Sequence, residues 1–341
     1  MQKDHYGILQ VRPEASSEVI EAAYKALMKL HHPDRNATAT MARYLNEARE
    51  VLVDPARRAE YDKLLRTNRP NGRFGIGRIV GNYKIVRQIA EGGIGETYYA
   101  EHVINGKPAC LKHCSKLRPA YQDVMLREVD AAWDLSHFSI PQIRDLLKMD
   151  DGTLVIVSKF IEGLTVAQMV EKVGRIYPED VTSIAERVLN VLWYLHDNRI
   201  VHGDIKPQNI IVKPKSRSVF VIDFGLAMVK PTATDTSMGY TDLFAPPEQV
   251  GMDKPLLPAS DFYSMGMTML WALCGGIEDD VKSLRVPADT PDQLCDFMKR
   301  LLVRDVLARP QNAEPLYEEI GKIREIAFGR RRTGGSPMRG F

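Results

Sequence analysis

The segment from residue 202 to residue 225 constrains this chain more than any other, and it reads HGDIKPQNIIVKPKSRSVFVIDFG. Two polar loops flank a short apolar hairpin, which we expect to run through 210–212 and then 219–222. Carboxylate and amide oxygens placed at strand ends can position a hydroxyl group and hold magnesium, which are the needs of phosphoryl transfer. The pattern predicts a phosphoryl-transfer site, although a polar loop before an ordinary strand is the alternative. The polar residues concerned are Asp204, Lys206, Asn209 and Asp223.

The same stretch resembles the catalytic loop and the DFG segment of the eukaryotic-like (Hanks-type) protein kinases. The resemblance implies that Asp204 deprotonates the acceptor hydroxyl and that Lys206 neutralises the moving phosphoryl group. It also implies that Asn209 and Asp223 hold Mg²⁺. A lysine two residues after the catalytic aspartate is the serine/threonine form of this loop. The resemblance covers residues 83 to about 328.

The resemblance also implies an ATP site upstream of this loop. Residues 90–95 read AEGGIG, and glycines let backbone N–H groups close over phosphate oxygens. Lys112 would hold the α- and β-phosphates and pair with Glu128, on a helix expected at 123–136. Ala109 would cover the adenine, and Ser158 would be a small gatekeeper before the hinge. The implied nucleotide-binding residues are Ala90 (in place of the first glycine of the motif), Gly92, Gly93, Gly95, Ala109, Lys112, Ser158, Phe160 and Ile211.

Residues 241–248, TDLFAPPE, match the end of the kinase activation segment. By the resemblance, Thr241 contacts Asp204 and Lys206, whereas Glu248 forms a buried structural ion pair with Arg309. Asp261 would anchor the catalytic loop from its helix, and His202 is expected to be a packed core histidine.

Gly203 stands where many relatives carry an arginine that reads phosphate on the activation segment. The sequence therefore predicts an activity that depends little on phosphorylation of that segment.

Residues 3–66 predict a compact helical unit, because apolar residues recur at helical spacing over 18–31 and 39–53. The turn between these helices reads His32-Pro33-Asp34, and the unit resembles a J domain. The resemblance implies that the tripeptide stimulates a DnaK-type chaperone and that Lys25 and Lys29 meet an acidic chaperone surface. A J-like hairpin that has become a spacer is the alternative.

Composition sets the remaining bounds. A net charge of +2 argues against a dedicated nucleic-acid surface. The N-terminal residues lack a signal peptide, and no apolar run is long enough to span a membrane. The four cysteines form no CxxC pair, which indicates a reducing compartment and no metal site of their own. We expect a cytoplasmic protein without a membrane partner.

The expected fold class is multidomain, with an α J domain followed by an α+β bilobal kinase fold. The domains are expected at 3–66, with a flexible linker at 67–82, a kinase domain at 83–328 and a disordered basic tail at 329–341. Within the kinase domain, a β-rich lobe at 83–160 would precede a helical lobe at 161–328.

The predicted function is ATP- and Mg²⁺-dependent phosphorylation of serine and threonine in proteins, in a chain that also recruits a chaperone and is bacterial in type. One alternative is a pseudokinase adaptor without phosphotransfer, although Lys112, Asp204 and Asp223 are all present. Another is a kinase of small molecules, which the peptide-docking character of 241–248 disfavours.

Overall fold

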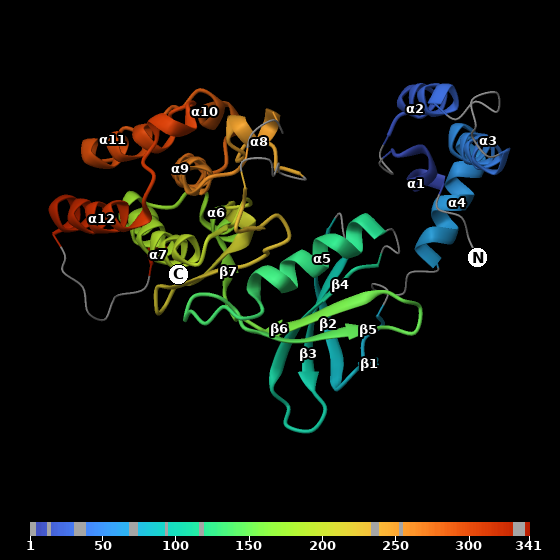
Figure 1. Cartoon of the computed structure of the whole chain (residues 1–341), viewed down its shortest axis with the longest axis horizontal. Coiled ribbons are helices and arrows are strands. Elements are labelled where there is room, and N and C mark those ends of the chain that lie inside the picture. Colours follow the sequence, from blue (N-terminus) through green and yellow to red (C-terminus); the bar gives the residue numbers. More distant parts are fainter. Residues whose placement is uncertain are drawn as a thin grey trace. The chain divides into compact units, whose positions relative to one another are not determined.

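A computed structural model describes residues 5–11, 15–30, 39–67, 74–92, 95–115, 119–232, 239–251, 255–329 and 338–341. The chain divides into two compact units, Met1–Gly75 and Ile76–Phe341. Figure 1 labels their elements along the chain.

The first unit is helical, as the sequence predicted. Its core is made of apolar side chains from all four helices, among them Leu9, Ile20, Leu52 and Tyr61. Asp54 begins the fourth helix, because its Oδ1 accepts the backbone N–H groups of Ala56 and Arg57 at 2.9 and 3.0 Å. The helices are α1 (His5–Leu9), α2 (Ser17–Leu30), α3 (Ala39–Val53) and α4 (Pro55–Thr67).

The second unit begins with a six-stranded antiparallel sheet in the order β1-β2-β3-β4-β6-β5. One helix, α5 (Pro119–Ala132), lies along this sheet in Figure 1. It begins and ends about one turn earlier than the sequence predicted. The strands are β1 (Ile79–Val80), β2 (Tyr83–Glu91), β3 (Glu96–His102), β4 (Pro108–His113), β5 (Ile143–Lys148) and β6 (Leu154–Lys159).

The expected linker at 67–82 is wrong over its second half. Val80 is fully buried and pairs with Tyr83, and the N–H of Gly77 donates to the carbonyl of Ile85 at 2.8 Å. Residues 76–82 are therefore the first strand and turn of the sheet. The two-residue strand was too short to show an alternating pattern in the sequence.

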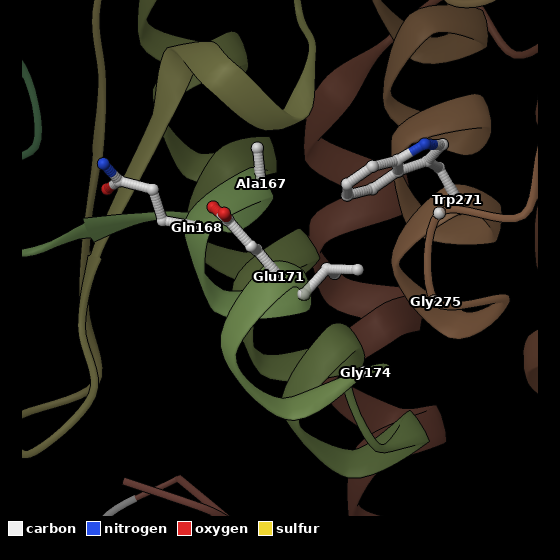
Figure 2. Close-up of a pocket in the computed structure, with 8 residues that line it drawn as sticks. Ala167, Gln168, Glu171, Gly174, Trp271 and Gly275 are labelled. Atoms are coloured by element: carbon white, nitrogen blue, oxygen red, sulfur yellow. The ribbon is translucent and has the colours of Figure 1, made fainter.

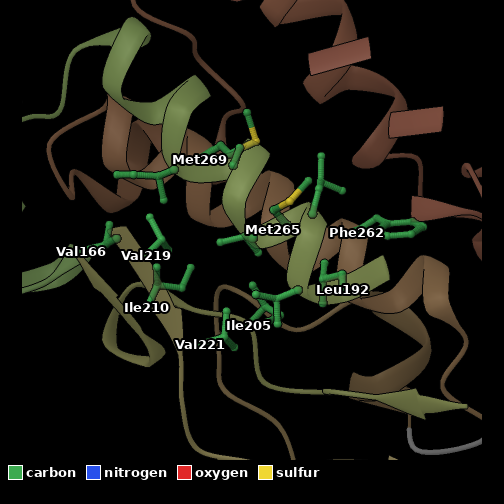
Figure 3. Close-up of a cluster of buried hydrophobic side chains, with 14 of the residues drawn as sticks. Val166, Leu192, Ile205, Ile210, Val219, Val221, Phe262, Met265 and Met269 are labelled. Atoms are coloured by element: carbon green, nitrogen blue, oxygen red, sulfur yellow. The ribbon is translucent and has the colours of Figure 1, made fainter. Parts of the chain in front are cut away.

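The rest of the second unit is mainly helical, around a core into which α9 (Pro258–Leu273) contributes Phe262, Met265 and Met269 (Figure 3). Val166, Ile210 and Val219 bring α6 and a small hairpin onto the same core. The elements are β7 (Leu164–Thr165), α6 (Val166–Val173), α7 (Pro178–Asp197), β8 (Ile200–Val201), η2 (Pro207–Asn209), β9 (Ile210–Lys213), β10 (Ser218–Val221), β11 (Met228–Val229), α8 (Pro247–Gly251), α9, α10 (Glu278–Lys282), α11 (Asp292–Leu301), η3 (Val306–Ala308) and α12 (Ala313–Phe328).

The last four residues pack on this lobe, which differs from the expected disordered tail. Met338 is 1% exposed and its N–H donates to the carbonyl of Pro214 at 3.1 Å. The N–H of Arg339 donates to Oδ2 of Asp180 at 3.1 Å. Residues 338–341 are therefore part of the folded lobe.

None of the helices that the structure describes combines the length and the apolar character needed to cross a membrane.

Candidate active site

Asp261 on α9 anchors the catalytic loop through its backbone. Its carboxylate accepts the backbone N–H of His202 at 2.9 Å and that of Gly203 at 2.8 Å. Asp261 is 1% exposed, so these bonds are shielded from water. The predicted anchoring by Asp261 is confirmed. It fixes the two residues that immediately precede Asp204.

Asp204 is the centre of a hydrogen-bond network. Its Oδ1 accepts the hydroxyl proton of Thr241 at 2.8 Å, and its Oδ2 lies 2.7 Å from Nζ of Lys206. Lys206 also donates to the Thr241 hydroxyl at 2.9 Å. Asn209 donates its amide to Oδ2 and to the backbone carbonyl of Asp204, each at 2.9 Å. The structure thus brings together the four residues that the sequence assigned to this loop and to the activation segment.

Lys112 joins the two lobes through a pair of carboxylates. Its Nζ lies 2.6 Å from Oε2 of Glu128 on α5 and 2.7 Å from Oδ1 of Asp223. Burial opposes the lysine charge, but the two carboxylates outweigh it and raise the pKa of Lys112. Burial would also raise the pKa of Asp223, yet Lys112 lowers it to about 2. The site therefore keeps a cation and an anion in contact.

Asn209 and Asp223 suit a hard cation. The Asn209 amide nitrogen is engaged twice by Asp204, and no hydrogen bond among the described residues reaches its Oδ1. Asp223 stays ionised and adopts a left-handed backbone, with φ of +67°. Amide and carboxylate oxygens are the ligands that Mg²⁺ takes in nucleotide sites. The donor set fits the metal that the sequence implied.

The glycine-rich turn between β2 and β3 is crowded at Gly95 but open at Gly92. A Cβ atom at Gly95 would lie 1.8 Å from the carbonyl oxygen of His113. Gly92 closes the turn by donating its N–H to the Gly95 carbonyl at 2.9 Å. Ala90 is exposed at the end of β2, and Gly93 lies outside the described residues.

The expected position of Ala109 over the adenine is wrong. Successive side chains of a strand point to opposite faces, so Ala109 points away from the face that carries Lys112. Ala109 is fully buried and pairs with Ala100, which is also fully buried. Cys110 shares the face of Lys112, and burial raises the pKa of its thiol to about 11. Cys110, two residues before Lys112, therefore takes the position on this face that the sequence assigned to Ala109.

Ser158, Phe160 and Ile211 remain candidates for the adenine pocket. Ser158 on β6 pairs with Cys110 on β4, the strand that carries Lys112. The proposed gatekeeper is therefore a small side chain next to that strand. Phe160 packs edge-on against Tyr99, with ring centroids 4.7 Å apart. Ile211 is half-buried on β9.

The end of the activation segment is fastened by a buried ion pair, as predicted. Both guanidinium nitrogens of Arg309 reach the Glu248 carboxylate, at 2.7 and 2.8 Å. Ser260 donates a further hydrogen bond to Glu248 at 2.8 Å. The two side chains of the pair are 0% and 3% exposed, so the pair is structural.

His202 is a buried, neutral histidine. Its Nδ1 accepts the N–H of Asp204 at 3.2 Å, its Nε2 lies 3.3 Å from the Ile222 carbonyl, and its ring packs on Phe224. Burial lowers the pKa of His202, which keeps the ring uncharged. This agrees with the predicted core role.

An open hollow of about 520 Å³ lies between α6 and the end of α9. Figure 2 shows Glu171 on α6 and Trp271 on α9 on opposite sides of it. None of the residues predicted from the sequence lines this hollow.

In the helical unit, Lys25 and Lys29 are exposed on α2. His32, Pro33 and Asp34 lie outside the described residues. Arg49 of α3 pairs with Glu21 of α2 at 2.6 Å and so links these two helices.

A bilobal unit with this lysine, base and metal-ligand arrangement defines a protein kinase, and comparison with known families agrees. The protein kinase domain family matches residues 83–318, and the DnaJ domain family matches residues 4–62. The chain belongs to the protein kinase family and carries a DnaJ domain.

Bacterial serine/threonine-protein kinases are among the relatives. The serine/threonine-protein kinase PrkC of Bacillus subtilis is 31% identical over 216 residues, which cover 60% of this chain and 32% of that protein. The serine/threonine-protein kinase B of Synechocystis is 29% identical over 220 residues, which cover 58% of this chain and 38% of that protein. The chain therefore spans about a third of the length of these relatives.

Proposed function

We propose that this chain is an active serine/threonine protein kinase that transfers the γ-phosphoryl group of ATP to protein hydroxyls. The observation that carries the proposal is the convergence of Thr241, Lys206 and Asn209 on Asp204. The paired state of Lys112 with Glu128 supports it, because a catalytically closed site needs both.

The roles proposed for these residues are those that the resemblance implies, and the observed contacts are compatible with them. Bound ATP with Mg²⁺ would supply the transferable phosphoryl group and the charge that offsets its oxygens. Asp204 would orient the acceptor hydroxyl and take its proton, and Lys206 would place a positive charge beside it. Asn209 and Asp223 would hold the metal, and Lys112 with the backbone near Gly95 would hold the phosphates.

Transfer of radiolabel from ATP to a generic acceptor tests the proposal. Asp204→Asn should keep nucleotide binding but lower turnover roughly 10²–10⁴-fold, as expected for loss of a general base. Asp223→Asn should instead weaken Mg²⁺-dependent nucleotide binding. Asp296→Asn, on the exposed face of α11, is the matched control. Wild-type turnover in the Asp204 variant would refute the kinase assignment.

A pseudokinase adaptor is the second candidate, favoured by the fusion to a DnaJ domain. It would bind nucleotide or partners without transferring phosphate. Absence of label transfer by the wild-type chain on any acceptor, together with retained nucleotide binding, would support this candidate.

We also propose that the helical unit recruits and stimulates a DnaK-type chaperone. The exposed lysines Lys25 and Lys29 offer positive charge to an acidic surface, and the tripeptide His32-Pro33-Asp34 is intact in the sequence. ATP and such a partner fit the cytoplasm, which is the compartment we propose.

The chaperone proposal has a separate test. In the full-length chain, Asp34→Asn should abolish stimulation of a DnaK-type ATPase. Phosphorylation of a peptide by the same variant should stay at the wild-type rate and is the internal control. Undiminished stimulation would favour the spacer alternative for this unit.

A further inference from the structure

The backbone at Gly203 leaves no space for a side chain. Its φ is +72°, a region that residues with a Cβ rarely adopt. A Cβ atom there would lie 2.7 Å from the carbonyl oxygen of Leu226 and 3.2 Å from Cδ1 of Leu256. An arginine at this position could not be seated without moving the backbone.

The carbonyl of Gly203 accepts a hydrogen bond from a buried glutamine on α8. Gln249 on α8 is 1% exposed, and its Nε2 donates to Gly203 at 2.8 Å and to the carbonyl of Gly239 at 3.0 Å. A primary amide has two N–H donors, so each carbonyl can receive one. A single side chain therefore joins the catalytic loop to the activation segment.

This link continues a connected series of hydrogen bonds. The Gly203 N–H is held by Asp261, and its carbonyl is held by Gln249. Gly239 comes two residues before Thr241, whose hydroxyl bonds Asp204. Because the amide is buried, water does not compete for its two carbonyl partners. Two connections therefore link Thr241 to Asp261 on α9. One runs through Asp204, and the other runs through Gly239 and Gln249 to Gly203.

We propose that Gln249 is a positioning residue that holds the activation segment in its working arrangement through neutral hydrogen bonds. The inference rests on the proposed kinase activity and adds its mode of regulation. The segment reaches its arrangement without prior phosphorylation.

The test compares Gln249→Leu and Gln249→Glu in the full chain. Loss of both bonds in Gln249→Leu should lower kcat roughly tenfold or more, with KM for ATP nearly unchanged. Phosphatase-treated wild type should keep its rate. Gln293→Leu, exposed on α11, is the matched control and should behave as wild type.

The glutamate variant separates positioning from general packing. A carboxylate repels both carbonyls, whereas a protonated carboxyl group donates one hydrogen bond. Burial favours the protonated form. The deficit of Gln249→Glu should therefore shrink between about pH 8 and about pH 6, while that of Gln249→Leu stays constant. Equal and pH-independent deficits would reduce Gln249 to a packing role and overturn the proposal.

Hydrogen exchange supplies a readout that does not depend on turnover. In the unphosphorylated chain, amides of residues 239–245 should be protected in wild type and exchange faster in Gln249→Leu. Unchanged exchange in that variant, or a collapse of the wild-type rate after phosphatase treatment, would refute the proposal. A wild-type chain without any transfer, but with the expected exchange difference, would refute only the kinase activity.

Discussion

Thr241 donates its hydroxyl proton to Oδ1 of Asp204 at 2.8 Å, so a residue of the activation segment is bonded directly to the proposed catalytic base. The bond ties the arrangement of that segment to the orientation of the carboxylate. Lys206 reaches both residues and closes a three-membered network.

Removing the Thr241 hydroxyl should therefore impair catalysis. A hydrogen bond to a charged group contributes about 1.5–3 kcal/mol, so Thr241→Val should lower kcat roughly 10–100-fold. Thr241→Ser keeps the hydroxyl and should recover most of the rate. Steady-state kinetics on a peptide give both values; a valine variant with wild-type kcat would show that the bond is incidental.

The buried pair Glu248–Arg309 should matter for stability more than for chemistry. Arg309→Met leaves a buried carboxylate unpaired and should destabilise the kinase unit by about 3–5 kcal/mol. Adding Glu248→Met to this variant should restore part of the loss. All three tryptophans lie in the kinase unit, so urea unfolding followed by tryptophan fluorescence reports this unit alone. A double variant less stable than the single one would contradict the argument.

The packed C-terminal residues should stabilise the helical lobe. Met338 is 1% exposed, and truncating a buried methionine to alanine costs about 2–5 kcal/mol. Met338→Ala should lower the urea midpoint seen by tryptophan fluorescence. Ile326→Ala, at a side chain that is 70% exposed, is the control and should have little effect. Identical midpoints for the two variants would mean that the tail contributes nothing.

Stability should fall in mild acid because of His202. Burial lowers its pKa in the folded state below the ordinary value of 6.5, so the unfolded chain binds more protons. The stability is complete above that value and is lost as the pH falls through it toward the folded pKa. Between about pH 7.5 and about pH 5.5 the free energy of unfolding should fall by no more than about 1.4 kcal/mol per pH unit. His202→Asn should flatten this dependence; an unchanged slope would assign it to another group.

The adenine pocket should admit bulky purines. Ser158 pairs with Cys110 on the neighbouring strand, and both side chains are small. Ser158→Met should weaken binding of an N6-benzyl ATP analogue far more than binding of ATP, because the added side chain overpacks the pocket. Ser158→Ala is the control. Equal losses of affinity for both nucleotides would show that residue 158 is not the gatekeeper.

Much of the candidate site was predictable because its residues are close in sequence. Asp204, Lys206 and Asn209 lie on one loop, and their contacts follow from that loop. Ala109 was misplaced because the choice between it and Cys110 depends on which strand face is turned to Lys112. An error of one residue reverses that face.

Other features depend on contacts that a sequence does not display. Met338 is buried only because it reaches Pro214, more than a hundred residues earlier. Gln249 bonds two backbone carbonyls, and carbonyl partners leave no trace in residue type. Val80 belongs to a strand of two residues, which is too short for a recognisable pattern.

The left-handed backbone at Gly203 has an evolutionary consequence. A single codon change to arginine would not give this chain control by phosphate, since the residue would meet the Leu226 carbonyl before it could reach any phosphate. The side chain of Leu256 and the backbone of Leu226 would both have to move before a side chain could be accommodated at residue 203. Control by phosphate at this place therefore requires a change of the backbone at residue 203 as well as of its side chain.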